Sequence, residues 1–245
     1  MRKISVLTPS FNSGMYIENA ILSVVNQKYK NFEHIIVDNR STDNTLEIVK
    51  KYPHLKWISE KDKGQSDAMN KAFDLSTGEI IVYLNADDYF ADQVFETIAD
   101  EFDNHNKIDI IVGNGIEIHA NGRMETWYSE IDYSKILQFY KFQSPLNPVS
   151  YFYKRNVQNK IKFNVHNHFN MDYEFLLRAY QLFRIKKIEK NLGFFLQHAN
   201  NKSSKNNTYA ECKKTALRHC YKYDITKLLI YLPYFFKRKI LRLPL

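Results

Sequence analysis

The stretch GEIIVYLNADDYF, Gly78 to Phe90, sets five apolar residues directly before a polar turn with two adjacent carboxylates. The apolar run Ile80 to Leu84 does not alternate with polar residues, which indicates a strand buried on both faces of a sheet. Neighbouring carboxylates oppose each other's ionisation, so Asp87 and Asp88 at the end of this strand require a compensating group. The stretch therefore predicts a central strand of a covered sheet, with a polar site at its carboxyl end.

Strand and helix signals alternate along the first hundred residues. Apolar runs predict strands at residues 3–9, 32–38, 55–59 and 78–84. Amphipathic or capped segments predict helices at residues 15–26, 46–52 and 65–76. This alternation is typical of the α/β class with a doubly wound, mainly parallel sheet and helices on both faces.

After residue 108 the pattern changes. An Asn-Gly turn at 121–122 joins segments 109–119 and 123–129, which predicts an antiparallel hairpin. Further predicted elements are a helix near 132–141, a strand near 149–153, a helix at 171–183 and a strand at 185–198. We expect one domain with two halves, 1–108 and 109–205, followed by a basic helical tail, 206–245.

Charge and cysteine content limit the possible classes of protein. Residues 201–245 hold 11 of the 35 basic and 2 of the 27 acidic residues, so the rest of the chain is nearly neutral. A neutral body argues against nucleic-acid binding. Cys212 and Cys220 lie roughly 12 Å apart on a predicted helix, too far for a disulfide, which indicates a reducing compartment. With no signal-peptide pattern and no apolar run of roughly 20 residues, we expect a cytoplasmic protein.

Polar residues follow three of the predicted strands. Thr8 to Asn12 follow the first, Asp38 to Arg40 the second and Asn85 to Asp88 the fourth. Ligands of open parallel sheets bind outside the carboxyl ends of the strands. These turns contain neither the glycine-rich dinucleotide motif nor a P-loop, so bound phosphates would need a cation. Asp87 and Asp88 suit Mg²⁺ or Mn²⁺; the alternative is an acidic turn in which Asp88 or Asp92 caps the next helix.

Four motifs together resemble the inverting family 2 glycosyltransferases with the GT-A fold, of the bacterial polysaccharide or O-antigen biosynthesis type. They are SVLTPSFN, IIVDNRSTDNT, SEKDKGQSDAMNKAFDLSTGEIIVYLNADD and MDYEFLLRAY. The resemblance is dense over residues 3–90 and looser over about 144–205. It implies that residues 1–108 bind a nucleotide sugar and that 109–205 bind the acceptor.

The resemblance also implies roles for individual residues on the donor side. The nucleobase and ribose contacts correspond to Thr8, Pro9, Ser10, Asn12 and Asp38, and the segment that lines the nucleotide pocket corresponds to Gly64, Asp67 and Asn70. Asn85-Ala86-Asp87 occupies the D-x-D position, with Asn85 in place of the first Asp. We interpret this as a variant that retains a ribose contact.

A divalent cation, Mn²⁺ or Mg²⁺, is implied at Asp87 with Asp88, and His198 matches a histidine near the diphosphate or metal. A lone histidine after a strand is more often structural, so both interpretations of His198 stay open. Lys202 and Lys205 would either close over the phosphates or form a solvated basic loop.

Asp172 corresponds to the catalytic base of the family, although Met171 replaces the usual preceding Glu. It lies at the start of a predicted helix, where the helix dipole favours an ionised carboxylate. It shares a face with Phe175 and Leu176, so its side chain is expected to point inward. The alternatives are that Asp172 is an N-cap, or that Glu174 is the base.

The predicted reaction moves a sugar from a nucleotide sugar, UDP-linked by default, to a hydroxyl of a saccharide or lipid-linked saccharide. The basic, aromatic segment 227–242 is expected to contact an anionic membrane surface at its inner face, or to pack on protein. The alternative functions are a nucleotidyltransferase acting on sugar phosphates and a non-enzymatic polyanion-binding protein. Donor sugar, linkage and oligomeric state stay open.

Overall fold

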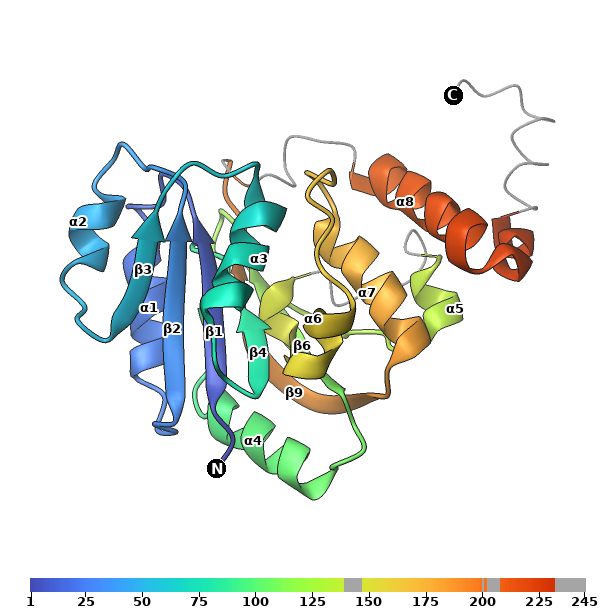
Figure 1. Cartoon of the computed structure of the whole chain (residues 1–245), viewed down its shortest axis with the longest axis horizontal. Helices are drawn as coiled ribbons and strands as arrows, with labels where there is room; N and C mark the ends of the chain where they lie inside the picture. Colours follow the sequence, from blue (N-terminus) through green and yellow to red (C-terminus); the bar gives the residue numbers. More distant parts are fainter. Residues whose placement is uncertain (139–146, 200, 202–207, 232–245) are drawn as a thin grey trace.

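A mixed sheet with strand order β3-β2-β1-β4-β8-β6-β9-β5 forms the centre of the protein, and β7 pairs with β6 beside this path (Figure 1). The computed structural model describes residues 1–138, 147–199, 201 and 208–231. The strands are β1 (Ile4–Ser10), β2 (Phe32–Asp38), β3 (Leu55–Ser59), β4 (Ile80–Tyr83), β5 (Tyr89–Phe90), β6 (Ile110–Ile118), β7 (Met124–Trp127), β8 (Tyr151–Lys154) and β9 (Ile185–Leu196).

Helices flank the sheet and continue into the C-terminal part. They are α1 (Ile17–Val25), α2 (Thr45–Val49), α3 (Gln65–Leu75), α4 (Val94–Asn104), α5 (Tyr133–Ile136), α6 (Arg155–Lys160), α7 (Met171–Leu182) and α8 (Thr208–Tyr223), with 3₁₀ segments η1 (Pro148–Ser150) and η3 (Ile225–Tyr231). The predicted helix near 132–141 and the segment 227–242 extend outside the described residues. In the described part of the chain, no helix has the length and apolar content needed to cross a membrane.

The first half of the chain confirms the predicted parallel architecture. Strand β1 pairs in parallel with β2 from Ile4–Phe32 to Ser10–Asp38, and β2 pairs in parallel with β3. On its other side β1 pairs in parallel with β4. The carboxyl ends of these strands therefore meet at one edge of the sheet, as the positions of the polar turns require.

Beyond β4 the sheet becomes mixed. Strand β8 is antiparallel to both β4 and β6, while β9 runs parallel to β6. The predicted hairpin is confirmed as the antiparallel pair β6–β7, and β5 pairs with β9. Strand β5 and helix α6 are additional to the elements predicted from the sequence, and α4 is the helix that follows the polar turn. Because β9 pairs with β5 next to the polar turn, residues about 110 positions apart meet there.

Two hydrophobic clusters cover the two faces of the sheet. Leu7 faces a cluster that includes residues of α3, α7 and α8, whereas its neighbour Val6 faces a cluster that includes α1 and α4. This alternation follows from the two-residue period of a strand. On α8, Cys212 and Cys220 are free, buried and part of the first cluster, which confirms that they do not form a disulfide.

Glu33 links several segments at the amino-terminal edge of the sheet, opposite the edge that carries the polar turns. Its carboxylate accepts hydrogen bonds from Ser5 Oγ and from the Thr77 backbone N–H, both at 2.7 Å. Lys56 and Lys3 donate to its other oxygen at 2.8 and 3.1 Å. Burial alone would raise the pKa of Glu33, but the hydrogen bonds, above all from Lys56, hold this pKa well below its usual range. The ionised form therefore stabilises the folded chain.

Glu33→Gln is expected to lower the free energy of unfolding at pH 7 by about 1–3 kcal/mol, because an amide loses both lysine partners. The folded pKa lies below the ordinary value of 4.5. The wild-type advantage should therefore be full above that value and disappear as the pH falls through the folded pKa. Urea denaturation over this pH range measures the effect.

Asp74→Asn is the matched control, since Asp74 pairs with Lys162 and both side chains are more than half exposed. Such a pair contributes at most about 1 kcal/mol. Equal unfolding free energies for wild type and Glu33→Gln at pH 7 would contradict the role given to Glu33.

Candidate active site

The turn after β1 is tied to the turn after β2. Asn12, at a φ of 47°, accepts a hydrogen bond from the Thr42 backbone at 2.8 Å. The Asp38 carboxylate accepts from the Ser41 backbone at 2.9 Å and from Ser59 Oγ at 2.7 Å. Asp38 is fully buried. In this arrangement Asp38 braces the edge that is predicted to contact the nucleoside.

Inside this edge, the side chain of Thr8 bonds His34 Nε2 at 2.9 Å. Burial lowers the pKa of His34 to about 3, so its ring is neutral at physiological pH. Pro9 separates Thr8 from Ser10, whose Oγ is buried and has no hydrogen-bond partner among the described residues. A buried hydroxyl without a partner at a strand end is the kind of group that a ligand satisfies.

The three residues predicted to line the nucleotide pocket lie at the N-cap and in the first half of α3, where they hold neighbouring segments. Gly64 has a φ of 113°, and a Cβ at this position would lie 3.0 Å from Nδ1 of His168, so glycine is required there. Asp67 accepts from the Lys63 backbone at 3.1 Å. Asn70 exchanges two hydrogen bonds with the backbone of Phe163. Loop 161–170 is thereby fixed against the start of α3.

Asp88 is the buried centre of the polar turn. Its carboxylate accepts hydrogen bonds from the Asn85 and Asn147 amides, both at 2.9 Å, and from the Leu196 backbone at 3.2 Å. Burial raises the pKa of Asp88 and the neighbouring Asp87 carboxylate raises it further, whereas the hydrogen bonds from Asn147, Asn85 and Leu196 lower it. With three donors converging on it, Asp88 connects β4, η1 and β9.

The helix-cap alternative for this turn is wrong. The N-cap of α4 is Gln93, at a φ of 61°, and not Asp88 or Asp92. Asn85 uses its amide to reach Asp88 and accepts a hydrogen bond from Gln65 at 3.1 Å. Ala86 is buried between these polar neighbours. An amide at position 85 therefore pairs with the buried carboxylate without adding a third negative charge.

Asp87 contacts the two polar side chains of the segment that follows β9. One of its oxygens lies 3.1 Å from His198 Nε2 and 3.1 Å from Asn201 Nδ2. The His198 ring stacks on Tyr16 at 4.4 Å, and Asn201 is buried and bonds the carbonyl of Leu196. The His198 and Asp87 side chains are 16% and 27% exposed, so a ligand could reach both.

This donor set fits a divalent cation. A carboxylate oxygen and an imidazole nitrogen 3.1 Å apart can share one metal ion, and both are established ligands of divalent metals. Tyr16 stacks on the ring of His198, and the side chain of Asn201 accepts a hydrogen bond from the His198 backbone N–H, so both hold the histidine beside Asp87. The residues that would hold the cation are Asp87 and His198, whereas Asp88 has its oxygens occupied by protein donors.

Asp172 lies in the first turn of α7, where the buried Tyr151 donates to its Oδ1 at 3.4 Å. The alternative that Asp172 is the N-cap is wrong, because the N-cap is Asn170. Glu174 points elsewhere and accepts hydrogen bonds from Asn164 and Asn167. Burial raises the pKa of Tyr151 well above its ordinary value, and nearby Asp172 adds to this.

Sequence reasoning did not single out Asn147, Asn201, Tyr16 or Gln65. All four bond or stack with predicted residues. The only local signal was the polar composition of the loop ANNKSSKNN and the proline-containing loop before β8. Lys202 and Lys205 lie outside the described residues.

The sheet order and this polar edge define the GT-A class of folds. The crystal structure of TarS 1–349 from S. aureus with UDP-GlcNAc matches with a TM-score of 0.75 and 23% identity, over 92% of this chain and 69% of TarS 1–349. Mannosyltransferase PcManGT from Pyrobaculum calidifontis, with GDP-Man and Mn²⁺, matches with a TM-score of 0.67 and 16% identity, over 90% and 64% of the two chains. At these identities the likeness concerns the fold.

The profile of the family "Glycosyl transferase family 2" matches residues 5–171, and the chain belongs to this family. An uncharacterized glycosyltransferase of Nostoc sp. is 32% identical over 147 residues, 56% of this chain and 46% of the relative. The poly(ribitol-phosphate) beta-N-acetylglucosaminyltransferase TarP of Staphylococcus aureus is 34% identical over 125 residues, 48% of this chain and 38% of TarP. The match thus spans less than half the length of these two relatives.

Asp88→Asn is expected to lower the free energy of unfolding by about 1–3 kcal/mol, because its amide adds an N–H group where three donors already converge. Asp87→Asn, one residue earlier and partly exposed, should change this free energy by less than about 0.5 kcal/mol. Chemical denaturation without added metal compares the two variants. Equal losses of unfolding free energy in the two variants would contradict the structural role given to the buried Asp88 and the accessible, ligand-binding role given to Asp87.

Proposed function

We propose that the protein is an inverting glycosyltransferase that moves a sugar from a nucleoside-diphosphate sugar to an acceptor hydroxyl. The single observation that carries this proposal is the Asp87–His198 pair at the carboxyl edge of the sheet, together with Asp172 on α7. The segment 147–151 contacts both the polar turn that contains Asp87 and the proposed base Asp172. Asn147 bonds Asp88 at its start and Tyr151 bonds Asp172 at its end.

The ligands of related structures support a nucleotide-sugar donor. TarS has been crystallised with UDP and with UDP-GlcNAc, and the PcManGT structure contains GDP-Man and Mn²⁺. We propose a UDP-linked donor by default. The Thr8–Asn12 turn, with the unpartnered Ser10 hydroxyl, would receive the nucleoside together with Asp38, and Gly64, Asp67 and Asn70 would border its pocket. Asn85 and Ala86 would lie beside the ribose.

A bound divalent cation would supply charge neutralisation for the diphosphate, and Asp87 and His198 would hold it. We propose Asp172 as the general base. It takes the proton of an acceptor hydroxyl, the acceptor oxygen forms a bond to the anomeric carbon, and the bond to the nucleoside diphosphate breaks. One attack from the opposite side inverts the anomeric configuration. Tyr151 donates to Oδ1 of Asp172 and helps to fix its orientation.

The acceptor is proposed to be a saccharide or a lipid-linked saccharide of polysaccharide biosynthesis. TuaG of Bacillus subtilis, 37% identical over 91 residues, is described as a putative teichuronic acid biosynthesis glycosyltransferase, which supports this class of pathway. A cytoplasmic location, and contact of residues 227–242 with an anionic membrane surface, stay predictions. The family membership argues against a nucleotidyltransferase and against a non-enzymatic polyanion binder.

Asp172→Asn is expected to reduce the transfer rate by about 10²–10⁴-fold, the usual contribution of a general base. Donor affinity should stay unchanged, because Asp172 acts on the acceptor. Release of nucleoside diphosphate from a panel of UDP- and GDP-sugars, with saccharide acceptors present, measures the rate, and calorimetry measures donor binding. Near-normal turnover in the variant would remove Asp172 from this role. If the wild type released nucleoside diphosphate from none of these donors, the proposed reaction would be rejected.

A further inference from the structure

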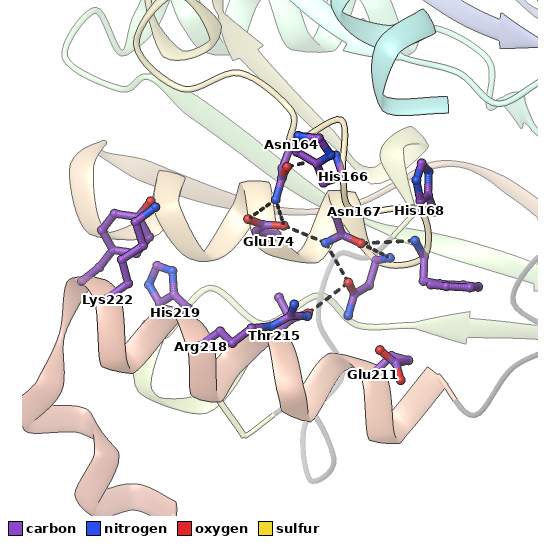
Figure 2. A pocket seen from close by; sticks show the side chains of 13 residues that line it. Asn164, His166, Asn167, His168, Glu174, Glu211, Thr215, Arg218, His219 and Lys222 are labelled. Carbon is purple, nitrogen blue, oxygen red and sulfur yellow. Dashed lines mark hydrogen bonds between the residues drawn. The ribbon is translucent and has the colours of Figure 1, made fainter. Parts of the chain in front are cut away.

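A polar cavity lies between loop 164–170, the first turns of α7 and helix α8, and neither Asp87 nor His198 lines it. Its volume is about 350 Å³, a size that suits small organic ligands. Figure 2 shows the labelled side chains of Asn164, Asn167 and Glu174 on one side and those of Thr215 and Arg218 on the other. We refer to this space as the α7–α8 pocket.

The walls of the α7–α8 pocket alternate hydrogen-bond donors and acceptors. Glu174 accepts from Asn164 and Asn167, and Asn167 donates to Asn170 at 2.9 Å. Thr215 continues the same chain by donating to Asn170 at 3.1 Å. Amides and hydroxyls that both donate and accept complement the hydroxyl groups of a sugar, which do the same.

The formal charges that line the α7–α8 pocket balance. The lining holds two acidic residues, Glu174 of α7 and Glu211 of α8, and two basic residues of α8, Arg218 and Lys222. His219, which also lines the cavity, is buried, and burial lowers its pKa to about 4, so it is neutral near pH 7. A balanced lining of this kind favours a neutral polar ligand over an anion such as phosphate.

Two buried polar atoms in this lining have no hydrogen-bond partner among the described residues. They are Nδ1 of His219, a side chain that is 3% exposed, and Nδ2 of Asn170, which is 9% exposed and has the weakly accepting Cys212 thiol nearby. Buried polar atoms are rarely left without partners in folded proteins. Both residues line the pocket, so a ligand bound there would lie beside them.

An exposed aromatic ring stands at the same place. Phe169 lines the α7–α8 pocket and its side chain is 53% exposed, although its backbone N–H donates to Asn167 Oδ1 at 3.2 Å. Apolar rings next to a few convergent polar groups are typical of small-molecule sites. A sugar presents an apolar C–H face as well as hydroxyl groups. Phe169 complements the apolar face, and the hydrogen-bonded side chains of Asn167, Asn170, Glu174 and Thr215 complement the hydroxyl groups.

The lining of the α7–α8 pocket is close in sequence to the proposed base. Asn170 is the N-cap of α7, and Asp172 follows two residues later. Loop 164–170 is anchored on the donor side as well, since Ser66 of α3 donates to the carbonyl of Asn167 at 3.1 Å. Glu174 and Asp172, two positions apart on the helix, project in different directions. A chain of sugars could therefore pass from one to the other around the start of α7.

We propose that the α7–α8 pocket binds a neutral sugar residue of the acceptor, at a position removed from the hydroxyl that reacts. This inference rests on the proposed function for the identity of the ligand as an acceptor. In this proposal Phe169 and Arg218 determine which lengths of saccharide acceptor are preferred. Neither side chain holds the donor or moves the proton. An acceptor with several sugar units would occupy this pocket and the reaction centre together, whereas an acceptor of one sugar unit could occupy only one of the two places at a time.

Binding can be tested without any transfer reaction. The full chain, labelled with ¹⁵N, is titrated with neutral methyl glycosides of glucose, galactose and N-acetylglucosamine and with inorganic phosphate. The expected result is that at least one glycoside shifts the amide signals of loop 164–170 and α8. Phe169→Ala and Arg218→Ala should each weaken its affinity about fivefold or more, and Tyr221→Ala should leave it unchanged. Tyr221 is 76% exposed on the same helix and does not line the pocket.

Unchanged signals with every glycoside, or shifts with phosphate alone, would overturn the proposal. Equal weakening by Tyr221→Ala would overturn it too, because that result indicates a general effect on α8. Phe169 and Arg218 are exposed, so their variants should fold normally, and thermal unfolding checks this. Donor turnover with no glycoside binding would reject the pocket and leave the proposed function standing. Glycoside binding without turnover of any donor would reject the proposed function and leave the α7–α8 pocket standing as a glycoside-binding site.

Discussion

The arrangement of the candidate active site depends on one buried carboxylate. Asp88 is fully buried and accepts hydrogen bonds from Asn85, Asn147 and the Leu196 backbone. These three donors come from the end of β4, from the segment before η1 and from the end of β9. A buried carboxylate is tolerated only when donors satisfy it, so Asp88 requires these segments to meet. Segments from both halves of the chain are thereby held at one edge of the sheet.

This constraint separates the roles of the two adjacent carboxylates. Because Asp88 is directed inward, Asp87 is left facing His198 and Asn201 at an accessible position. The segment that donates to Asp88 through Asn147 leads directly into Tyr151, which contacts Asp172. The proposed cation ligands and the proposed base are thus positioned by one continuous set of contacts. The like charges that posed a problem in the sequence are resolved by burying one of them among N–H donors.

Much of the first half of the fold could be predicted because its signals are local. Apolar runs such as 32–38 and 55–59 coincide with the observed strands β2 and β3. Asn147 and Asn201 could not be predicted, because their partners lie 59 and 114 positions away and no periodic pattern encodes such contacts. The burial of Asp88 was missed for the same reason. In contrast, His198 and Asp172 were proposed as site residues from the order and spacing of the motifs that resemble the family, and Asp87 also from its position at the carboxyl end of a strand.

The central question is whether Asp87 couples nucleotide binding to a divalent cation. Calorimetric titration of the full chain with UDP and GDP, each with and without Mn²⁺, measures this coupling most directly. We expect Mn²⁺ to raise the affinity for at least one of these nucleotides about tenfold or more, and Asp87→Ala to abolish the increase. Affinities that are the same with and without Mn²⁺ in the wild type, or an increase that survives in Asp87→Ala, would contradict the proposed role of Asp87.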